Sequence, residues 1–369
     1  YKKYKNPIMV LGSVRDYHAV DWYLNLYKID RNIIFVSDCN NGEGLINQLP
    51  KCHEYISLFA LDNLLMKSQS NYANLWRNIL KIIILPLNSF LLLIICLRLK
   101  PKIIHAHPLY YGLVCRVINK KYIVTPQGSE ILVRAKNNYL YRLFAGIILK
   151  GAESITTDSY KMKDEINNFY DLKANVIQNG IDTFAIIKST KEKYLSKNEY
   201  LLSFRSIHEN YRIIDVLKSR NYSCPDKPIY FVYPSFDNVY LNELKKYLKP
   251  FDKLLGKVEK EKLYALMSGS IATISIPISD SSPKSVYESI FAGAPTILQK
   301  NPYQSLMTNS MKSRVITISS KDFEDPFWLN HSIKKALNIF REYLPCKLSF
   351  EKFDSGLVLK STYSLLYKQ

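Results

Sequence analysis

The sequence predicts an α/β protein with two domains in series, each built on a parallel sheet. The chain has 369 residues, which is long for one domain and suits two. Hydrophobic residues make up 47% of it, enough to fill two cores. Short continuous apolar runs alternate with helix-length segments, a pattern typical of buried strands in βαβ units.

The first half of the chain contains six predicted strands and two clear helices. The loop 38–44 follows the second strand, and the loop 127–129 follows the fourth. Residues 75–99 and 109–118 are expected to be helical, because both are too long for strands. The six expected strands are 7–13, 31–37, 102–107, 122–126, 154–157 and 175–178.

The same pattern restarts after a polar segment rich in Lys and Ser, residues 188–199, which we interpret as an interdomain linker. A second parallel sheet is therefore expected. Its strands are 200–204, 229–233, 271–276 and 295–298, and its helices are 211–220, 239–248, 259–268 and 284–293.

The chain is strongly basic, with a net charge of +19. A basic surface favours phosphate-rich partners: nucleic acid, anionic lipid headgroups or pyrophosphate-bearing substrates. The basic residues are scattered, and neither a zinc spacing nor a nucleic-acid motif is present, so no nucleic-acid partner is expected. None of the six cysteines forms a C-x-x-C pair. We therefore expect reduced, buried thiols in a cytoplasmic protein and no metal site.

The most apolar segment, residues 82–97, is too short for a transmembrane helix. A span needs about 20 apolar residues, and this one is interrupted by Pro86, Asn88 and Ser89. A buried helix is the favoured interpretation, and a helix that dips into a membrane surface is the alternative.

The segment 278–298 carries the strongest functional signal. Asp280 and Glu288 are eight residues apart, and a helix is expected to begin near Pro283. The small residues between them leave backbone N–H groups open to a phosphate at the helix N-terminus. A carboxylate two turns into the helix suits a ribose diol. An ordinary capped surface helix would show the same pattern.

This segment resembles the carboxylate-x7-carboxylate signature of retaining GT-B glycosyltransferases of family 4, where it ends in a Gly-x-Pro turn like Gly293-Ala-Pro295. Four further pieces are similar to family motifs and come in the family's order: IIHAH at 103–107, VTPQG at 124–128, NGID at 179–182 and SFR at 203–205.

The resemblance implies the GT-B fold: two Rossmann-like parallel-sheet domains facing each other across a cleft. Residues 1–183 would form an N-terminal acceptor-side domain, on which a C-terminal helix at 350–369 packs back. Residues 184–349 would form the domain that binds the nucleotide sugar.

The resemblance also implies roles for individual residues. Asp280 would contact hydroxyls of the transferred sugar, Arg205 would neutralise the leaving pyrophosphate, and His107 would lie near the anomeric centre. His105, two residues earlier on the same strand, is expected to be a core histidine. No metal or other cofactor is required. The implied donor-binding residues are Gly12, Arg205, Lys257, Val258, Ser281, Ser282, Lys284, Ser285, Val286 and Glu288.

The sequence also departs from the family. Many relatives have Lys at the position of Tyr211, and Arg212 or Lys284 are the candidates to replace that charge. Gln127 stands where the family usually has His.

The implied function is transfer of a hexose from a nucleoside-diphosphate sugar, with UDP favoured, to a saccharide or polyprenyl-linked acceptor. Bacterial surface polysaccharide of the O-antigen or capsule type is the implied pathway, at the inner face of the cytoplasmic membrane and in peripheral contact with it. A degenerate domain that binds without catalysis is the alternative. An inverting transferase or an epimerase usually lacks the Asp280–Glu288 pair.

Overall fold

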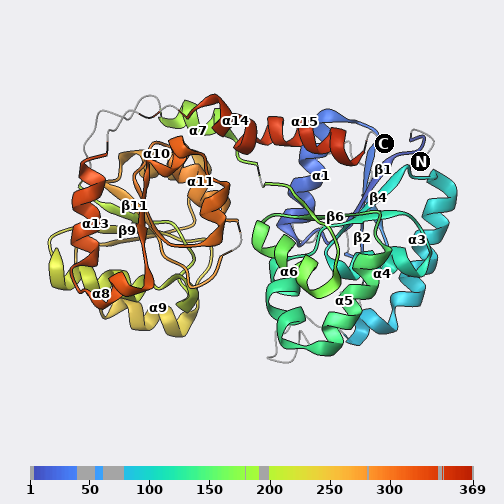
Figure 1. Cartoon of the computed structure of the whole chain (residues 1–369), viewed down its shortest axis with the longest axis horizontal. Coiled ribbons are helices and arrows are strands. Elements are labelled where there is room, and N and C mark those ends of the chain that lie inside the picture. The colour runs from blue at the N-terminus through green and yellow to red at the C-terminus, as the bar shows by residue number, and fades with distance from the viewer. Residues whose placement is uncertain are drawn as a thin grey trace. The chain divides into compact units, whose positions relative to one another are not determined.

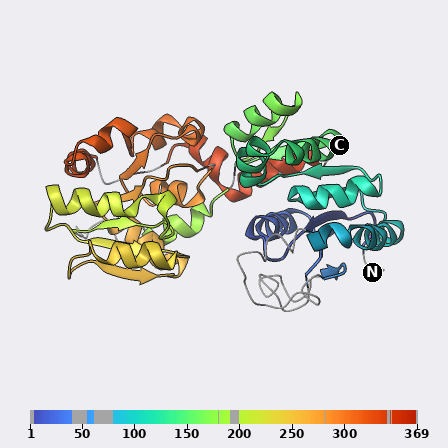
Figure 2. The same ribbon diagram turned by 90° about the horizontal axis from the view of Figure 1, so that it is seen from below.

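The computed structural model describes residues 4–39, 55–60, 79–178, 180–190, 199–280, 282–339, 343 and 345–367. The chain divides into two compact units (Figures 1 and 2). Unit 1 comprises Tyr1–Ile177 and Leu359–Gln369, and unit 2 comprises Gln178–Val358.

Unit 1 is built on a parallel sheet with the order β3-β2-β1-β4-β5-β6-β7. The central strands β1 and β4 are not consecutive in sequence, and their pairing aligns Gly12 with His107. Both are almost wholly buried, as expected for parallel strands covered by helices on two faces. The strands are β1 (Ile8–Gly12), β2 (Ile33–Ser37), β3 (Tyr55–Ser57), β4 (Ile103–His107), β5 (Tyr122–Val124), β6 (Ser154–Thr157) and β7 (Asn175–Val176).

Three helices of unit 1, α1, α5 and α6, begin at side-chain caps. Asp16, Asn138 and Ser159 each accept a hydrogen bond from a backbone N–H in the first turn of the helix that follows. Helix α4 packs against α3 on one side and α5 on the other (Figure 1). The helices are α1 (Tyr17–Ile29), α3 (Leu85–Leu99), α4 (Leu109–Val117), α5 (Tyr139–Gly151) and α6 (Tyr160–Tyr170), with a π-helical segment at Glu130–Ala135.

Unit 2 repeats this plan with the strand order β10-β9-β8-β11-β12-β13, again parallel. Separate apolar clusters fill its core, one of which includes Val286, Ile290 and Phe291 of a single helix. The strands are β8 (Leu201–Ser203), β9 (Ile229–Val232), β10 (Lys253–Gly256), β11 (Ala272–Ser275), β12 (Thr296–Gln299) and β13 (Val315–Ile318).

The helices of the second half follow the strands in turn, and the last of them returns to unit 1 from Leu359 onward. They are α7 (Thr183–Thr190), α8 (Ile213–Ser223), α9 (Asn238–Lys245), α10 (Lys260–Gly269), α11 (Lys284–Phe291), α12 (Asn309–Lys312), α13 (Trp328–Leu337), α14 (Lys347–Phe353) and α15 (Ser355–Leu366).

The structure corrects the prediction of one final helix at 350–369. Two helices, α14 and α15, meet at Asp354, whose carboxylate accepts hydrogen bonds from the backbone N–H groups of Gly356 and Leu357 at 3.0 Å each. An aspartate that bonds the next turn's amides ends one helix and begins another.

The helix expected to be buried at 82–97 is buried on one side only, so that expectation is wrong for its outer side. Leu92, Cys96 and Leu99 of α3 are buried, whereas Phe90 and Leu97 on its outer side are about 60% exposed. Within the described parts of the chain, no helix is both long enough and apolar enough to span a membrane.

The expectation of buried thiols holds for some cysteines only. Cys39, Cys96 and Cys115 are buried, Cys224 is half-buried, and Cys346 is exposed just before α14. Cys52 lies outside the described residues.

Candidate functional site

The strand order of unit 2 creates a switch point between β8 and β11. The chain leaves these two neighbours in opposite directions along the sheet, so the loops after their carboxyl ends diverge. Such points are where open parallel sheets bind ligands. Arg205 lies in the loop after β8, and Asp280 lies in the loop between β11 and α11.

Arg205 connects these two loops directly. Its Nη2 atom lies 2.5 Å from Oδ2 of Asp280, and its Nη1 atom donates to Oγ of Ser285 at 3.1 Å. The side chains of Arg205 and Asp280 are only 10% and 16% exposed. A guanidinium held in this way keeps a fixed orientation, which suits planar recognition of carboxylate or phosphate oxygens.

Tyr211 and Arg212 follow Arg205 by six and seven residues, and their side chains make different contacts. The guanidinium carbon of Arg205 lies 4.6 Å from the centroid of the Tyr211 ring, so the tyrosine supports the arginine through a cation–π contact. Arg212 points elsewhere: it bonds Oδ2 of Asp215 at 2.8 Å and covers the ring of Phe323 at 4.0 Å. The sequence identified the change to Tyr211 but not this packing.

Helix α11 presents its first turn to the same place. Lys284 is its first residue, and Ser285 is the residue that bonds Arg205. Ser282, just before the helix, is buried and accepts a hydrogen bond from Nε2 of Gln178 at 2.7 Å. Val286 lies in the core, and its backbone N–H bonds the carbonyl of Pro283. Ser281 lies outside the described residues.

Glu288 is buried one turn further along α11, at 7% exposure. Its Oε1 atom accepts a hydrogen bond from the Tyr264 hydroxyl at 3.1 Å and lies 3.5 Å from Nζ of Lys260. Both partners belong to α10, and sequence analysis missed them because they lie 24 or more residues away with no motif in common.

The turn after β10 completes this end of the sheet. Gly256 has a φ of +65°, and a Cβ atom placed there would meet open space, so the backbone angle explains the glycine. Lys257 is exposed and Val258 is half-buried beside the core of unit 2. Their predicted donor contacts stay predictions.

In unit 1, Gly12 and His107 end the paired strands β1 and β4. A Cβ atom on Gly12 would lie 2.8 Å from Cβ of Ala19 and 3.0 Å from the carbonyl oxygen of His107, so close packing of α1 on the sheet requires glycine. The His107 side chain is buried, and its Nε2 atom has no hydrogen-bond partner among the described residues. Burial, with the nearby His18 adding to it, lowers the pKa of His107 to about 3.

His105 is a satisfied core histidine, as predicted. Its Nε2 atom pairs with Oγ1 of Thr125 at 2.8 Å, and its Nδ1 atom pairs with the hydroxyl of Tyr367. Trp22 of α1 donates to the same hydroxyl at 3.0 Å. The His105 ring stacks on that of His107 with centroids 4.3 Å apart, so the C-terminal tyrosine supports the layer beneath His107.

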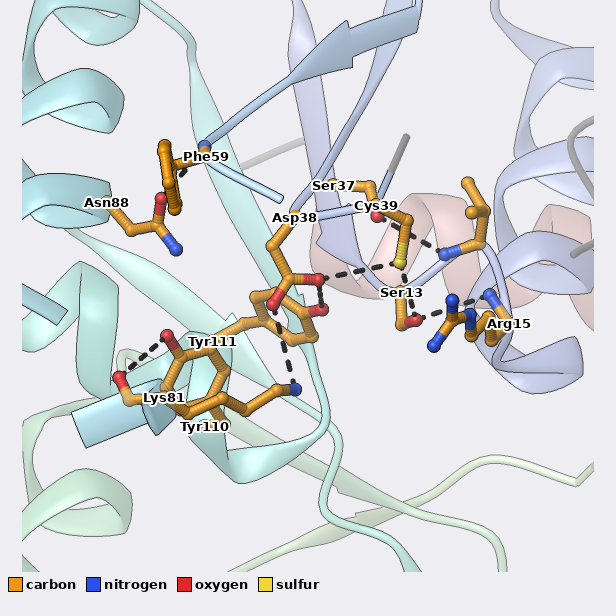
Figure 3. A network of polar contacts seen from close by, with 11 residues as sticks. Ser13, Arg15, Ser37, Asp38, Cys39, Phe59, Lys81, Asn88, Tyr110 and Tyr111 are labelled. Atoms are coloured by element: carbon orange, nitrogen blue, oxygen red, sulfur yellow. Dashed lines mark hydrogen bonds and ion pairs between the residues drawn. The ribbon is translucent and has the colours of Figure 1, made fainter. Parts of the chain in front are cut away.

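Asp38 lies after β2, where dinucleotide-binding domains carry the acid that holds a ribose. Figure 3 shows that its carboxylate has other partners in this chain. The Tyr111 hydroxyl of α4 donates to Oδ1, and Nζ of Lys81 lies 3.6 Å from Oδ2. The Cys39 thiol lies 3.7 Å from Oδ1 and 3.3 Å from Oγ of Ser13. This network ties the ends of β1 and β2 to the helical layer.

The structure thus brings Arg205, Asp280 and Ser285 together in unit 2, and places Gly12 and His107 together in unit 1. In the described part of the chain, no group of three or more His, Cys, Asp or Glu side chains is arranged to hold a metal ion.

The similarity of this chain to known proteins lies in its structure. No family model matches the sequence, and no curated protein matches it. Among solved structures, HepE from Anabaena in complex with UDP matches with a TM-score of 0.65 and 12% identity, covering 98% of this chain and 100% of that one. A glycosyltransferase from Rickettsia africae matches with a TM-score of 0.66 and 16% identity, covering 100% of both chains.

A third match is the apo form of the lipopolysaccharide outer core galactosyltransferase WaaB. Its TM-score is 0.68 at 12% identity, covering 98% of this chain and 100% of that one. At such identities the likeness establishes the fold. The chain therefore has the two-domain α/β fold of GT-B glycosyltransferases over its whole length, which confirms the predicted fold class.

Proposed function

We propose that this protein is a retaining glycosyltransferase that moves a hexose from a nucleoside-diphosphate sugar, preferably a UDP-sugar. The observation that carries the proposal is the Arg205–Asp280–Ser285 cluster at the switch point of unit 2. A fold match alone would leave the chemistry open, because one fold hosts many functions.

In the proposed reaction Arg205 binds the diphosphate, and Asp280 turns to hydroxyls of the transferred sugar. A guanidinium has five N–H donors in a rigid fork, so it stabilises the charge that develops on the departing phosphate oxygen. The acceptor hydroxyl attacks from the face that the leaving group vacates, and the departing phosphate takes its proton. His107, neutral at pH 7 because of its lowered pKa, contacts the donor sugar by hydrogen bonding. Glu288 holds the ribose.

The structure favours Lys284 over Arg212 as the replacement for the charge that the family carries at position 211. Arg212 is committed to Asp215 and to the ring of Phe323. Lys284 begins α11, directly before the serine that Arg205 contacts, and the N-terminal end of a helix attracts phosphate.

The acceptor and the pathway follow from likeness alone. HepE was solved with UDP and with UDP and glucose, and WaaB is named as a lipopolysaccharide outer core galactosyltransferase. We propose a saccharide or polyprenyl-linked acceptor in bacterial surface-polysaccharide synthesis, with the protein at the inner face of the cytoplasmic membrane.

Thermal-shift assays with UDP, GDP, ADP, CMP and dTDP test the donor site, followed by nucleotide-release assays with the matching sugar nucleotides. UDP is expected to stabilise the wild type most, because a ligand that binds only the folded state raises its stability. Glu288→Ala and Lys284→Ala should both reduce the shift.

Arg212→Ala is the matched control, and it should keep the full nucleotide shift. If no nucleotide stabilises the wild type, the proposal fails. If UDP binds but no sugar nucleotide is consumed with any acceptor, the chain is a binding module on this fold.

A further inference from the structure

Helix α3 carries an apolar stripe on the side that faces away from the sheet. Ile83 lies in the helical turn just before α3, and Leu87, Phe90 and Leu97 belong to α3. These four residues follow one another at intervals of four, three and seven, the spacing of one helix face. They are 64%, 41%, 60% and 62% exposed. On the opposite side the polar Asn88 is buried and accepts a hydrogen bond from the backbone N–H of Phe59 at 3.0 Å.

The stripe has a counterpart on α5. Leu140, Leu143 and Ile147 are 75%, 49% and 58% exposed and again share one helix face. Helix α4 lies between α3 and α5 in the same layer, and its Val117 is 54% exposed. Scattered exposed apolar residues are normal, but two aligned stripes in one layer mark an interaction surface.

The charge on this layer is of one sign. Between residues 79 and 152 the sequence has a single acidic residue, Glu130, and its side chain is buried. Exposed basic residues accompany the apolar ones: Arg98, Lys100, Arg116, Arg134, Lys136 and Lys150.

We propose that the outer face of α3, α4 and α5 docks on an anionic phospholipid bilayer, with the apolar stripes entering the headgroup region. Apolar side chains flanked by Lys and Arg are the features that hold a protein on such a surface. A second copy of this chain fits poorly, because a two-fold contact would set the same basic residues against each other. The proposal identifies the surface for the membrane association included in the proposed function, and it rests on that association.

The test is co-sedimentation with vesicles of phosphatidylcholine, alone or mixed with phosphatidylglycerol. Wild-type protein is expected to bind the mixed vesicles at low salt and to be released at high salt, because salt screens the basic residues. The triple substitution Ile83→Asn, Phe90→Asn and Leu97→Asn leaves the charge unchanged. It should weaken binding at least about tenfold, through the loss of apolar contacts alone.

The matched control changes three exposed apolar residues of unit 2: Phe184→Asn, Val239→Asn and Leu337→Asn, at 77%, 78% and 59% exposure in the wild type. It should bind vesicles as the wild type does. Equal binding by both triple variants, or equal loss in both, overturns the proposal. The proposal is also overturned if the wild-type protein does not bind vesicles but forms dimers, and the α3 triple variant abolishes those dimers. The face would then be a contact between two copies of this chain.

Nucleotide binding separates this proposal from the donor-site proposal. The α3 triple variant should keep its UDP thermal shift, which also shows that it is folded. Vesicle binding without any nucleotide binding would leave the docking face standing while the transferase proposal falls.

Discussion

Two stacked histidines in unit 1 make stability depend on pH. The ordinary pKa of 6.5 falls to about 3 for His107 and well below 6.5 for His105, in both cases mainly because of burial. Below about pH 6.5 the unfolded chain therefore binds protons at these histidines that the folded chain does not bind. Stability is complete above that pH and is lost as the pH falls toward 3, with a slope of up to about 1.4 kcal/mol per pH unit for each histidine.

Urea unfolding from about pH 7 down to about pH 5 checks this expectation. His107→Gln removes one of the two groups and should flatten the slope relative to the wild type. Parallel curves for wild type and His107→Gln would show that His107 is not held neutral.

Contacts between distant residues define the environment of the candidate site, and sequence motifs could not supply them. Arg205, Asp280 and Ser285 were predicted from the resemblance, and the fold brings them within hydrogen-bond distance. The ring of Tyr211 beneath Arg205 was not predicted, because packing of an aromatic ring depends on the turn between them. Tyr367, 262 residues from its partner His105, leaves no local signal at all.

At the scale of elements, the central strands were predicted, whereas the edge strands β3, β10 and β13 were not. The runs that became β1, β2, β4 and β11 are almost wholly buried and mostly apolar, because helices cover both faces of the sheet. The sequence of β10, Lys-Leu-Leu-Gly, is short and partly exposed at a sheet edge, so it lacks that signature. The edge strands β3 and β13 are likewise short and partly exposed.

Helix α15 is held to unit 1 by two tyrosines with unequal burial. Tyr367 is 1% exposed and bonds both Trp22 and His105, whereas Tyr363 bonds Oδ2 of Asp30 at 2.6 Å in a more open place. Tyr367→Phe leaves the buried His105 ring and the half-buried Trp22 N–H without their hydroxyl partner. It should lower the free energy of unfolding by about 1–3 kcal/mol, measured by urea denaturation.

Tyr363→Phe is the comparison on the same helix and should cost about 1 kcal/mol or less, because water can replace the lost hydroxyl. Equal effects of the two substitutions would mean that the Tyr367 contacts carry no more stability than a surface bond.

At the scale of the whole molecule, the two units share one plan and differ in their chemistry. Each has its switch point between the first and the fourth strand of its sheet. Unit 2 places an ion pair and a helix N-terminus there, which suits an anionic ligand. Unit 1 places a glycine and a neutral histidine there, and carries the basic, apolar layer on its helices.

Titration calorimetry of UDP with the complete chain tests the central claim, that the donor site is built around Arg205. Arg205→Ala should weaken UDP binding at least about tenfold, because a charge-assisted hydrogen bond contributes about 1.5–3 kcal/mol. The UDP affinity of Arg205→Lys should lie between those of the wild type and Arg205→Ala, since lysine keeps the charge but loses the forked guanidinium. Arg212→Ala should bind like the wild type. UDP binding by Arg205→Ala at wild-type affinity, in protein shown to be folded, would contradict the account.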